Sequence, residues 1–155
     1  MTDVLELRLE PQSLHCRLGD RTLTLPVGPI TLARSIAGDP PAPADLTNAI
    51  GLVADHLDDV DRELPEALLA ARVVVAGHGV AALADVELGA AAVLPADLTR
   101  AAVEEVFRTL ATETAADRSR NPGLEAAWVH DILGTCCAVV AVMRHFALDR
   151  IELAS

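Results

Sequence analysis

The stretch ARVVVAGHGVAALADV, residues 71–86, contains the pattern on which the fold prediction rests. Three consecutive valines form an apolar β-branched run that is too short for a helix and is typical of a buried strand. The glycines at 77 and 79 permit a positive φ, or the close approach of another backbone segment. The Ala- and Leu-containing residues that follow favour a helix. We therefore predict a strand, a tight Gly-His-Gly turn and a helix.

This turn is also a candidate ligand site. A strand that passes through a glycine turn into a helix presents free backbone N–H groups and the positive end of the helix dipole, which can hold a phosphate. Gly77, His78 and Gly79 are therefore candidate ligand-binding residues. The same joint is common in α/β proteins, and for this motif alone we favour a purely structural role. No second His or Cys lies near His78 at metal-binding spacing, and we predict no metal and no cofactor.

Length and composition predict a single domain, residues 1–155. A chain of this size buries a core of its own but leaves no room for a second autonomous domain. Hydrophobic residues make up 52% of the chain and aromatic residues only 2%, so the core must be packed from Ala, Val, Leu and Ile. The mean hydropathy of +0.35 is high for a soluble chain and indicates an apolar surface that meets a partner or a second copy.

The charge balance excludes several classes of partner. With a formal net charge of −11, the chain offers no broad attractive surface to nucleic acid, to polyphosphate or to an anionic membrane, because all three are polyanions. The most basic cluster is Arg118, Ser119, Arg120 and Asn121, which precedes a Pro-Gly turn. We interpret this cluster as a solvated loop.

The sequence contains no targeting or membrane signal that we recognise. Residues 1–7, MTDVLEL, lack the basic and apolar regions of a signal peptide. The longest uncharged run, residues 132–143, is too short to span a bilayer. The three cysteines form neither a disulfide framework nor a CxxC motif. We expect a cytoplasmic protein.

The first part of the chain predicts an antiparallel meander. Apolar and polar residues alternate in three short segments separated by turns, which is the period of half-buried strands. The apolar positions are Leu5, Leu7, Leu9, Leu14, Cys16, Leu18, Leu23, Leu25 and Val27. The proline-rich residues 26–43 then predict a loop with at most a short helix near 32–36.

The remaining segments predict mainly helices. Asp45 or Thr47 caps a helix whose acidic face, within residues 55–63, we interpret as solvated and not as a metal site, because it lacks the spacing of a calcium loop. Further predicted elements are a short helix at 68–71 opened by Pro65, a helix begun by Asp97 or Thr99, a long apolar core helix within 124–147 and a final strand at 151–153. Residues 87–95 stay unassigned.

Four segments together resemble a known family. They are LPVGPITLARS (25–35), VVVAGHGVAALA (73–84), LPADLTRAAVEEVFRTLA (94–111) and NPGLEAAWVHDILGTCCAVVAVMRHFALDRIELAS (121–155). Their order and spacing resemble the second lobe of the exopolyphosphatase and guanosine pentaphosphate phosphatase (Ppx/GppA) family, in the actin-like ATPase clan. The resemblance implies an α/β, RNase H-like lobe: a mixed sheet of three antiparallel strands extended by parallel strands, with helices on both faces.

The departures from the family matter for function. The family's first hairpin in this lobe carries Asp-Ile-Gly-Gly-Gly-Ser, whose Asp helps to hold a divalent cation and whose glycine amides cradle phosphate. Here residues 8–13 read Arg-Leu-Glu-Pro-Gln-Ser, so that only Ser13 is retained as a ligand-binding candidate. The Arg of the family's Arg-Ala-Asp-Val-Ile motif becomes Val129, whereas Asp131 stays in place, and we interpret this Asp as a hydrogen-bonding residue and not as a catalyst.

These departures lead to three functional hypotheses. Phosphoryl transfer needs groups from both sides of a cleft, and the family's first lobe has no counterpart in these residues, so we expect no catalytic residue. The leading hypothesis is a non-catalytic binding, scaffold or regulatory protein that associates with itself. The alternative is a subunit of a two-chain phosphatase acting on polyphosphate or guanosine pentaphosphate, with the other lobe on a partner chain. The third is a sensor that binds phosphate or a nucleotide at the Gly77 turn.

Overall fold

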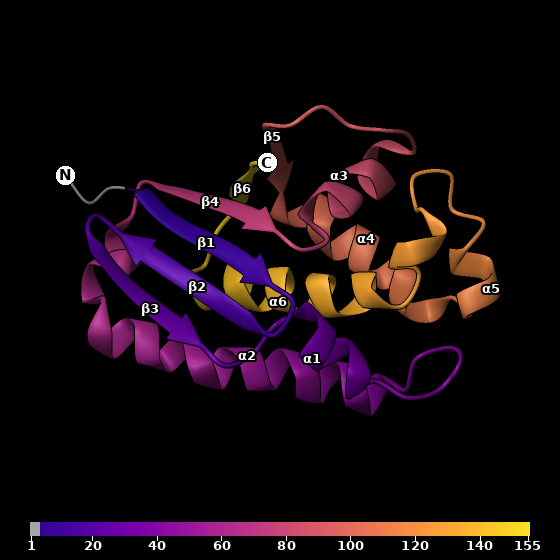
Figure 1. Ribbon diagram of the computed structural model, residues 1–155, viewed down its shortest axis with the longest axis horizontal. Helices are drawn as coiled ribbons and strands as arrows, with labels where there is room; N and C mark the ends of the chain where they lie inside the picture. Colours follow the sequence, from indigo (N-terminus) through magenta and orange to yellow (C-terminus); the bar gives the residue numbers. More distant parts are fainter. Residues whose placement is uncertain (1–3) are drawn as a thin grey trace.

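The computed structural model describes residues 4–155; the first three residues of the predicted domain and of the segment MTDVLEL lie outside this range. Its centre is a six-stranded mixed sheet with the strand order β3-β2-β1-β4-β6-β5 (Figure 1). The strands are β1 (Val4–Glu10), β2 (Ser13–Leu18), β3 (Arg21–Leu25), β4 (Arg72–Gly77), β5 (Ala96–Thr99) and β6 (Arg150–Leu153). The α/β architecture and mixed sheet predicted from the sequence are confirmed.

Strand pairing follows the prediction except at one edge. Strands β1, β2 and β3 form an antiparallel meander, β4 pairs with β1 in parallel, and β6 pairs with β4 in parallel. At the far edge, β5 pairs antiparallel to β6, and this strand was missed. The sequence ADLT contains one buried residue, Leu98, so its pattern is too short to distinguish a strand from a helix cap.

Within residues 4–155, eight helical segments connect and cover the strands. They are α1 (Pro29–Arg34), α2 (Pro43–Glu63), η1 (Pro65–Leu69), α3 (Val80–Leu88), α4 (Arg100–Thr112), α5 (Ala115–Arg118), η2 (Ala126–Trp128) and α6 (Asp131–His145), where η marks a 3-10 helix. Figure 1 shows α2 running along the meander and α6 in the middle of the molecule. None of these helices is both long and apolar enough to cross a membrane.

Several predicted helix boundaries need correction. Helix α2 begins at Pro43 after Ala42, and not at Asp45 or Thr47, because proline is preorganised for the first helical position. The alternative start at Thr99 is confirmed: the Thr99 hydroxyl accepts a hydrogen bond from the amide of Ala102 at 3.1 Å. Helix α1 begins earlier than predicted, at residue 29, whereas the short helix that we expect Pro65 to open does start at residue 65 as η1.

The single long helix predicted within residues 124–147 is wrong. The chain forms the short η2 first, and α6 starts only at Asp131. Two tertiary contacts hold the intervening residues out of one continuous helix. The carbonyl oxygen of Val129 accepts a hydrogen bond from the side chain of Arg118 at 2.9 Å, and the imidazole of His130 lies 3.0 Å from the carbonyl oxygen of Ala33. These partners are not visible in the local sequence.

The core lies on one face of the sheet. In β1, Leu5, Leu7 and Leu9 are buried. Their cross-strand partners in β2 and β4 are buried apolar residues, except for Gly77, which pairs with Leu9 and is only partly buried. Helix α6 is buried at every position from 132 to 143 and contacts α1, α2 and α4. An all-round apolar helix of this kind packs on several sides.

On the opposite face of the sheet, the part formed by β1, β2 and β4 is not covered by the second helical layer that the resemblance implies. Among the described residues, the side chains on that face of β1 and β2 include Glu6, Arg8, His15 and Arg17, and all four are exposed. Val74, on the same face of β4, is only partly buried. A helix packed there would bury this valine and require apolar partners, so this face is open.

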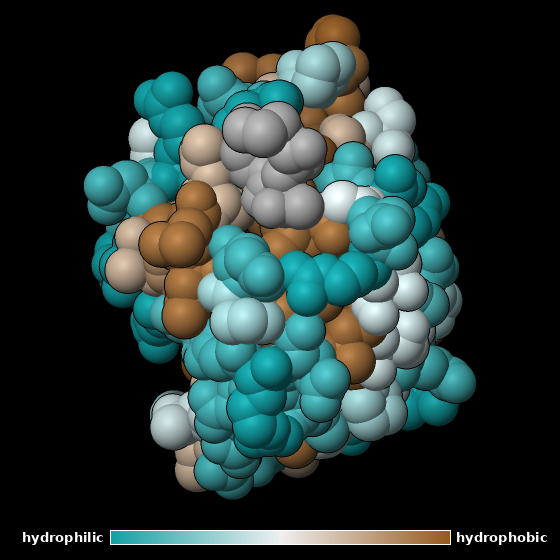
Figure 2. All heavy atoms as spheres, turned by 90° about the vertical axis from the view of Figure 1, so that its left-hand side faces the viewer, coloured by the Kyte–Doolittle hydropathy of each residue, from teal (hydrophilic) through white to brown (hydrophobic). Residues whose placement is uncertain are grey.

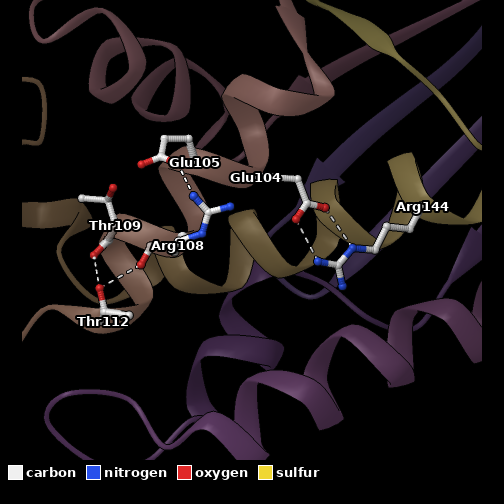
Figure 3. Close-up of polar contacts among 6 residues, drawn as sticks. All are labelled: Glu104, Glu105, Arg108, Thr109, Thr112 and Arg144. Carbon is white, nitrogen blue, oxygen red and sulfur yellow. Dashed lines mark hydrogen bonds and ion pairs between the residues drawn. The ribbon is translucent and has the colours of Figure 1, made fainter.

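Two adjacent residues in the last turn of α6 connect it to its neighbours. Figure 3 shows Arg144 of α6 directed at Glu104 of α4, and the guanidinium donates two hydrogen bonds to the carboxylate at 2.9 and 2.8 Å. These bonds hold the pKa of Glu104 below its ordinary value. The next residue, His145, contacts Asp61 of α2 at 2.9 Å.

We expect Glu104→Gln to lower the free energy of unfolding by about 1 kcal/mol at pH 7, because a charge-assisted pair becomes a weaker neutral one. The pKa of this carboxyl is lowered by folding, so its contribution is present above the unfolded pKa and is lost as the pH falls through the folded value. Urea unfolding at pH 7 and at about pH 3 should show the wild-type advantage shrinking in acid.

The matched control is Glu105→Gln in the same helix. Glu105 pairs with Arg108, and both side chains are about two-thirds exposed, so the loss should stay below about 0.5 kcal/mol (Figure 3). Equal losses for the two variants, or a loss at Glu104 that persists unchanged in acid, would contradict this assignment.

Candidate functional site

The turn between β4 and α3 is shaped by close backbone contacts. Gly77 has φ +104°, and a Cβ atom there would lie 2.1 Å from the carbonyl oxygen of Leu9 in β1. The amide of His78 donates a hydrogen bond to that same oxygen at 2.7 Å. One of the turn's N–H groups is therefore used within the sheet and is not free for a ligand.

Helix α6 holds the other side of the turn. Gly79 has φ +82°, and a Cβ atom there would lie 2.2 Å from the hydroxyl oxygen of Thr135. That hydroxyl donates a hydrogen bond to the carbonyl oxygen of His78 at 3.1 Å. Since contacts with β1 and α6 already require both glycines, the structural role that we favoured from the sequence accounts for them.

The side chain of His78 lies between Trp128, in η2, and Asp131, the first residue of α6. Its Nε2 atom is 3.6 Å from a carboxylate oxygen of Asp131, and its ring meets the ring of Trp128 edge to face, with centroids 4.7 Å apart. Only 20% of the side chain is exposed. Nε2 is buried and has no hydrogen-bond partner within the part of the chain that the structure describes. Trp128 is not among the residues predicted from the sequence, where its only signal is that it is the chain's one tryptophan.

A hollow of about 350 Å³ opens beside the turn. It is lined by the Gly-His-Gly residues, by Ala81 and Ala82 at the start of α3, and by Trp128. No side chain caps α3, so its first amides face this region without an intrahelical partner. The carboxylates of Asp85 and Glu125 also line the hollow, and they oppose the binding of an anion.

The hairpin between β1 and β2 has a different environment. The carbonyl oxygen of Pro11 accepts a hydrogen bond from the amide of Ile30 at 2.9 Å. A Cβ atom on Gly28 would lie 2.4 Å from the amide nitrogen of Ser13 and 2.6 Å from the carbonyl oxygen of Glu10. The hairpin backbone is therefore packed against the start of α1 and does not form an open cradle.

The side chains of the hairpin do not fit a divalent cation. Arg8, which stands where the resemblance places an aspartate, has its guanidinium 3.1 Å from the carboxylate of Glu10. A second hollow, of about 270 Å³, lies between this pair and His78. The guanidinium repels a metal ion by its charge, and it also occupies the carboxylate that the ion would need as a ligand.

The structure thus brings together four of the five candidate residues. Gly77, His78 and Gly79 adjoin Asp131, whereas Ser13 lies apart. The Ser13 hydroxyl is 3.1 Å from Nε2 of His15 on the open face of the sheet, and it lines neither hollow. Side chains alternate along a strand, and this alternation directs Ser13 away from the turn.

Comparison with known proteins gives structural matches only. No family model and no curated protein matches the sequence. The type II variant of the Aquifex aeolicus Ppx/GppA phosphatase matches with a TM-score of 0.87 at 18% identity, over 99% of this chain and 53% of that chain. An exopolyphosphatase-like protein matches with a TM-score of 0.90 at 14% identity, over 99% and 54% of the two chains.

An exopolyphosphatase from Cytophaga hutchinsonii matches with a TM-score of 0.77 at 14% identity, over 99% of this chain and 53% of its own. This chain spans about half the length of each of these proteins. At such low identity the matches establish the fold, and their extent is that of one lobe. The chain therefore has the fold of about half of each of these Ppx/GppA phosphatase and exopolyphosphatase structures.

Proposed function

We propose that this chain is a non-catalytic binding or scaffold protein built on one lobe of the Ppx/GppA fold, and that it associates with a second copy of itself. The observation that carries the proposal is the hairpin at residues 10–13. Its prolyl carbonyl and its packing against Gly28 serve the fold, and Arg8 replaces a cation-binding carboxylate. Phosphoryl transfer requires metal and phosphate to be positioned together, and these groups do not position them.

Exposed apolar side chains support self-association. Figure 2 shows the end of the molecule that lies at the left in Figure 1, where apolar patches lie between hydrophilic residues; α3 and its connection to β5 lie away from this end. Leu88 and Val93, in the connection from α3 to β5, are 60% and 86% exposed. This connection continues into Leu94, which lines the hollow beside the hairpin. A surface formed by the hairpin, the turn and this connection is our proposed interface.

Two measurements test the proposal. We expect no magnesium-dependent phosphate release from polyphosphate or guanosine pentaphosphate, and static light scattering should give a dimer at micromolar concentration. The double substitution Leu88→Ser and Val93→Ser should shift the protein toward monomer. The control, Leu68→Ser with Leu69→Ser in the exposed part of η1, should leave the dimer intact. Phosphate release, or a wild-type monomer, would overturn the proposal.

One observation favours the alternative of a two-chain phosphatase or a nucleotide sensor. The uncapped start of α3 and the imidazole of His78 adjoin a hollow large enough for a phosphate. Under this alternative, ATP, guanosine tetraphosphate or polyphosphate should raise the unfolding temperature, since a ligand at one hundred times its Kd stabilises the fold by about 2.7 kcal/mol. Phosphate release only when a partner chain is added would favour the two-chain enzyme.

A further inference from the structure

Three potential metal ligands meet between α2 and α6. Asp58 and Asp61 are three residues apart on α2, and this spacing places them on the same side of the helix. His145 comes from the last turn of α6, 84 residues further along the chain than Asp61. One ligand atom from each of the three lies within 4.8 Å of the others.

The histidine is held in place by its surroundings. Only 13% of its side chain is exposed, and its ring packs edge to face against the ring of Phe146, with centroids 4.8 Å apart. Nε2 lies 3.0 and 2.9 Å from the two carboxylate oxygens of Asp61. Because α2 and α6 pack along one another, the imidazole is held beside the Asp61 carboxylate, whereas Asp58 is exposed.

The chemistry of the three groups is that of a divalent transition metal. One imidazole and two carboxylates form a mixed nitrogen and oxygen set that suits Zn²⁺, Co²⁺ or Ni²⁺ better than Ca²⁺. Atoms within 4.8 Å of one another can reach a shared ion at about 2.0 to 2.2 Å after small side-chain rotations. No arginine of the described residues forms an ion pair with Asp58 or Asp61; the partner of Asp61 is the His145 imidazole, whose Nε2 must release its proton for a metal ion to bind there.

We propose that Asp58, Asp61 and His145 bind one divalent transition metal ion and that this ion links α2 to α6. The site is independent of the proposed function: Asp131, beside the Gly77 turn, begins the 15-residue helix α6, and His145 ends it, so the two lie roughly 20 Å apart. The acidic face of α2 does not form a metal site by itself, because the imidazole that completes the set of ligands comes from α6.

The test is calorimetric titration of the untagged protein with ZnCl₂, followed by thermal unfolding. We expect one ion per chain and, at saturating zinc, a rise in unfolding temperature of about 5 to 10 °C. His145→Ala and Asp61→Asn should each weaken binding at least about tenfold, and Asp58→Asn should weaken it less because Asp58 is the most exposed of the three. Co²⁺ should give a visible absorption spectrum that the same variants lose.

Two matched controls lie on the same helix. His56→Ala and Asp59→Asn remove the same groups from other sides of α2 and should leave zinc binding unchanged. His145→Gln removes the ligand while filling its space, and Asp61→Asn with Asp58→Asn leaves the packed histidine in place, so loss of binding is separable from loss of folding. Absence of stoichiometric zinc binding, or binding that survives these substitutions, would overturn the proposal.

Discussion

Gly134→Ala should destabilise the protein by about 3 kcal/mol, although alanine is the better helix former. Gly134 is buried in α6, and a Cβ atom there would lie 1.8 Å from the carbonyl oxygen of Pro29 and 2.7 Å from its carbonyl carbon. These are backbone atoms, so no side-chain rotation relieves the clash and α1 must move away. The amide of Ile30, in α1, also holds the hairpin through Pro11, so the displacement reaches the first two strands.

Gly51→Ala is the matched control for this substitution. Gly51 lies in α2, and a Cβ atom there would have no neighbour within 4 Å. The same change should therefore stabilise the protein by up to about 1 kcal/mol. Urea unfolding of both variants is the measurement, and a loss of similar size at the two positions would contradict the close approach of α1 to α6.

Arg118→Ala should cost about 3 to 4 kcal/mol, because it removes a buried cation that satisfies several backbone oxygens. Only 2% of Arg118 is exposed. Its guanidinium donates to the carbonyl oxygens of Val129 at 2.9 Å, Leu110 at 3.3 Å and Glu113 at 2.8 Å. The last two lie at the C-terminal end of α4, where a cation also complements the helix dipole. Burial lowers the pKa of this guanidinium.

Arg120→Ala provides the comparison two residues away. The guanidinium of Arg120 pairs with Asp117 at 2.9 Å, and 76% of its side chain is exposed, so its loss should change stability by no more than about 0.5 kcal/mol. Unfolding in guanidinium chloride, followed by circular dichroism, would measure the stability of both variants. If Arg118→Ala and Arg120→Ala lower the free energy of unfolding by the same amount, Arg118 does not hold the end of α4 in the way its hydrogen bonds indicate.

This pair of arginines illustrates the limit of prediction from sequence. The prediction of a solvated loop at residues 118–121 holds for Arg120 and is wrong for Arg118. Local sequence cannot separate them, because the carbonyl groups that bind Arg118 come from α4 and from the segment before α6. The same reason explains the missed break before Asp131 and the missed link between Asp61 and His145.

The parts predicted well depend on short-range patterns. Alternation identified the meander, three valines identified β4, and two glycines identified the turn that starts α3. The candidate residues of that turn were found for the same reason, and Asp131 joined them through the family resemblance. Ser13 lies apart from the other candidates, and the sequence could not indicate this because a retained residue type says nothing about which face of a strand carries it.

The central claim is that the hairpin at residues 10–13 cannot grip magnesium and phosphate. The most direct measurement is the amide NMR spectrum of the isotope-labelled protein during titration with magnesium and pyrophosphate. We predict that the amides from Leu9 to Leu14 keep their positions throughout, because Gly28, Ile30 and the Arg8–Glu10 pair already occupy the groups around them. Saturable, magnesium-dependent shifts confined to those amides would contradict the claim.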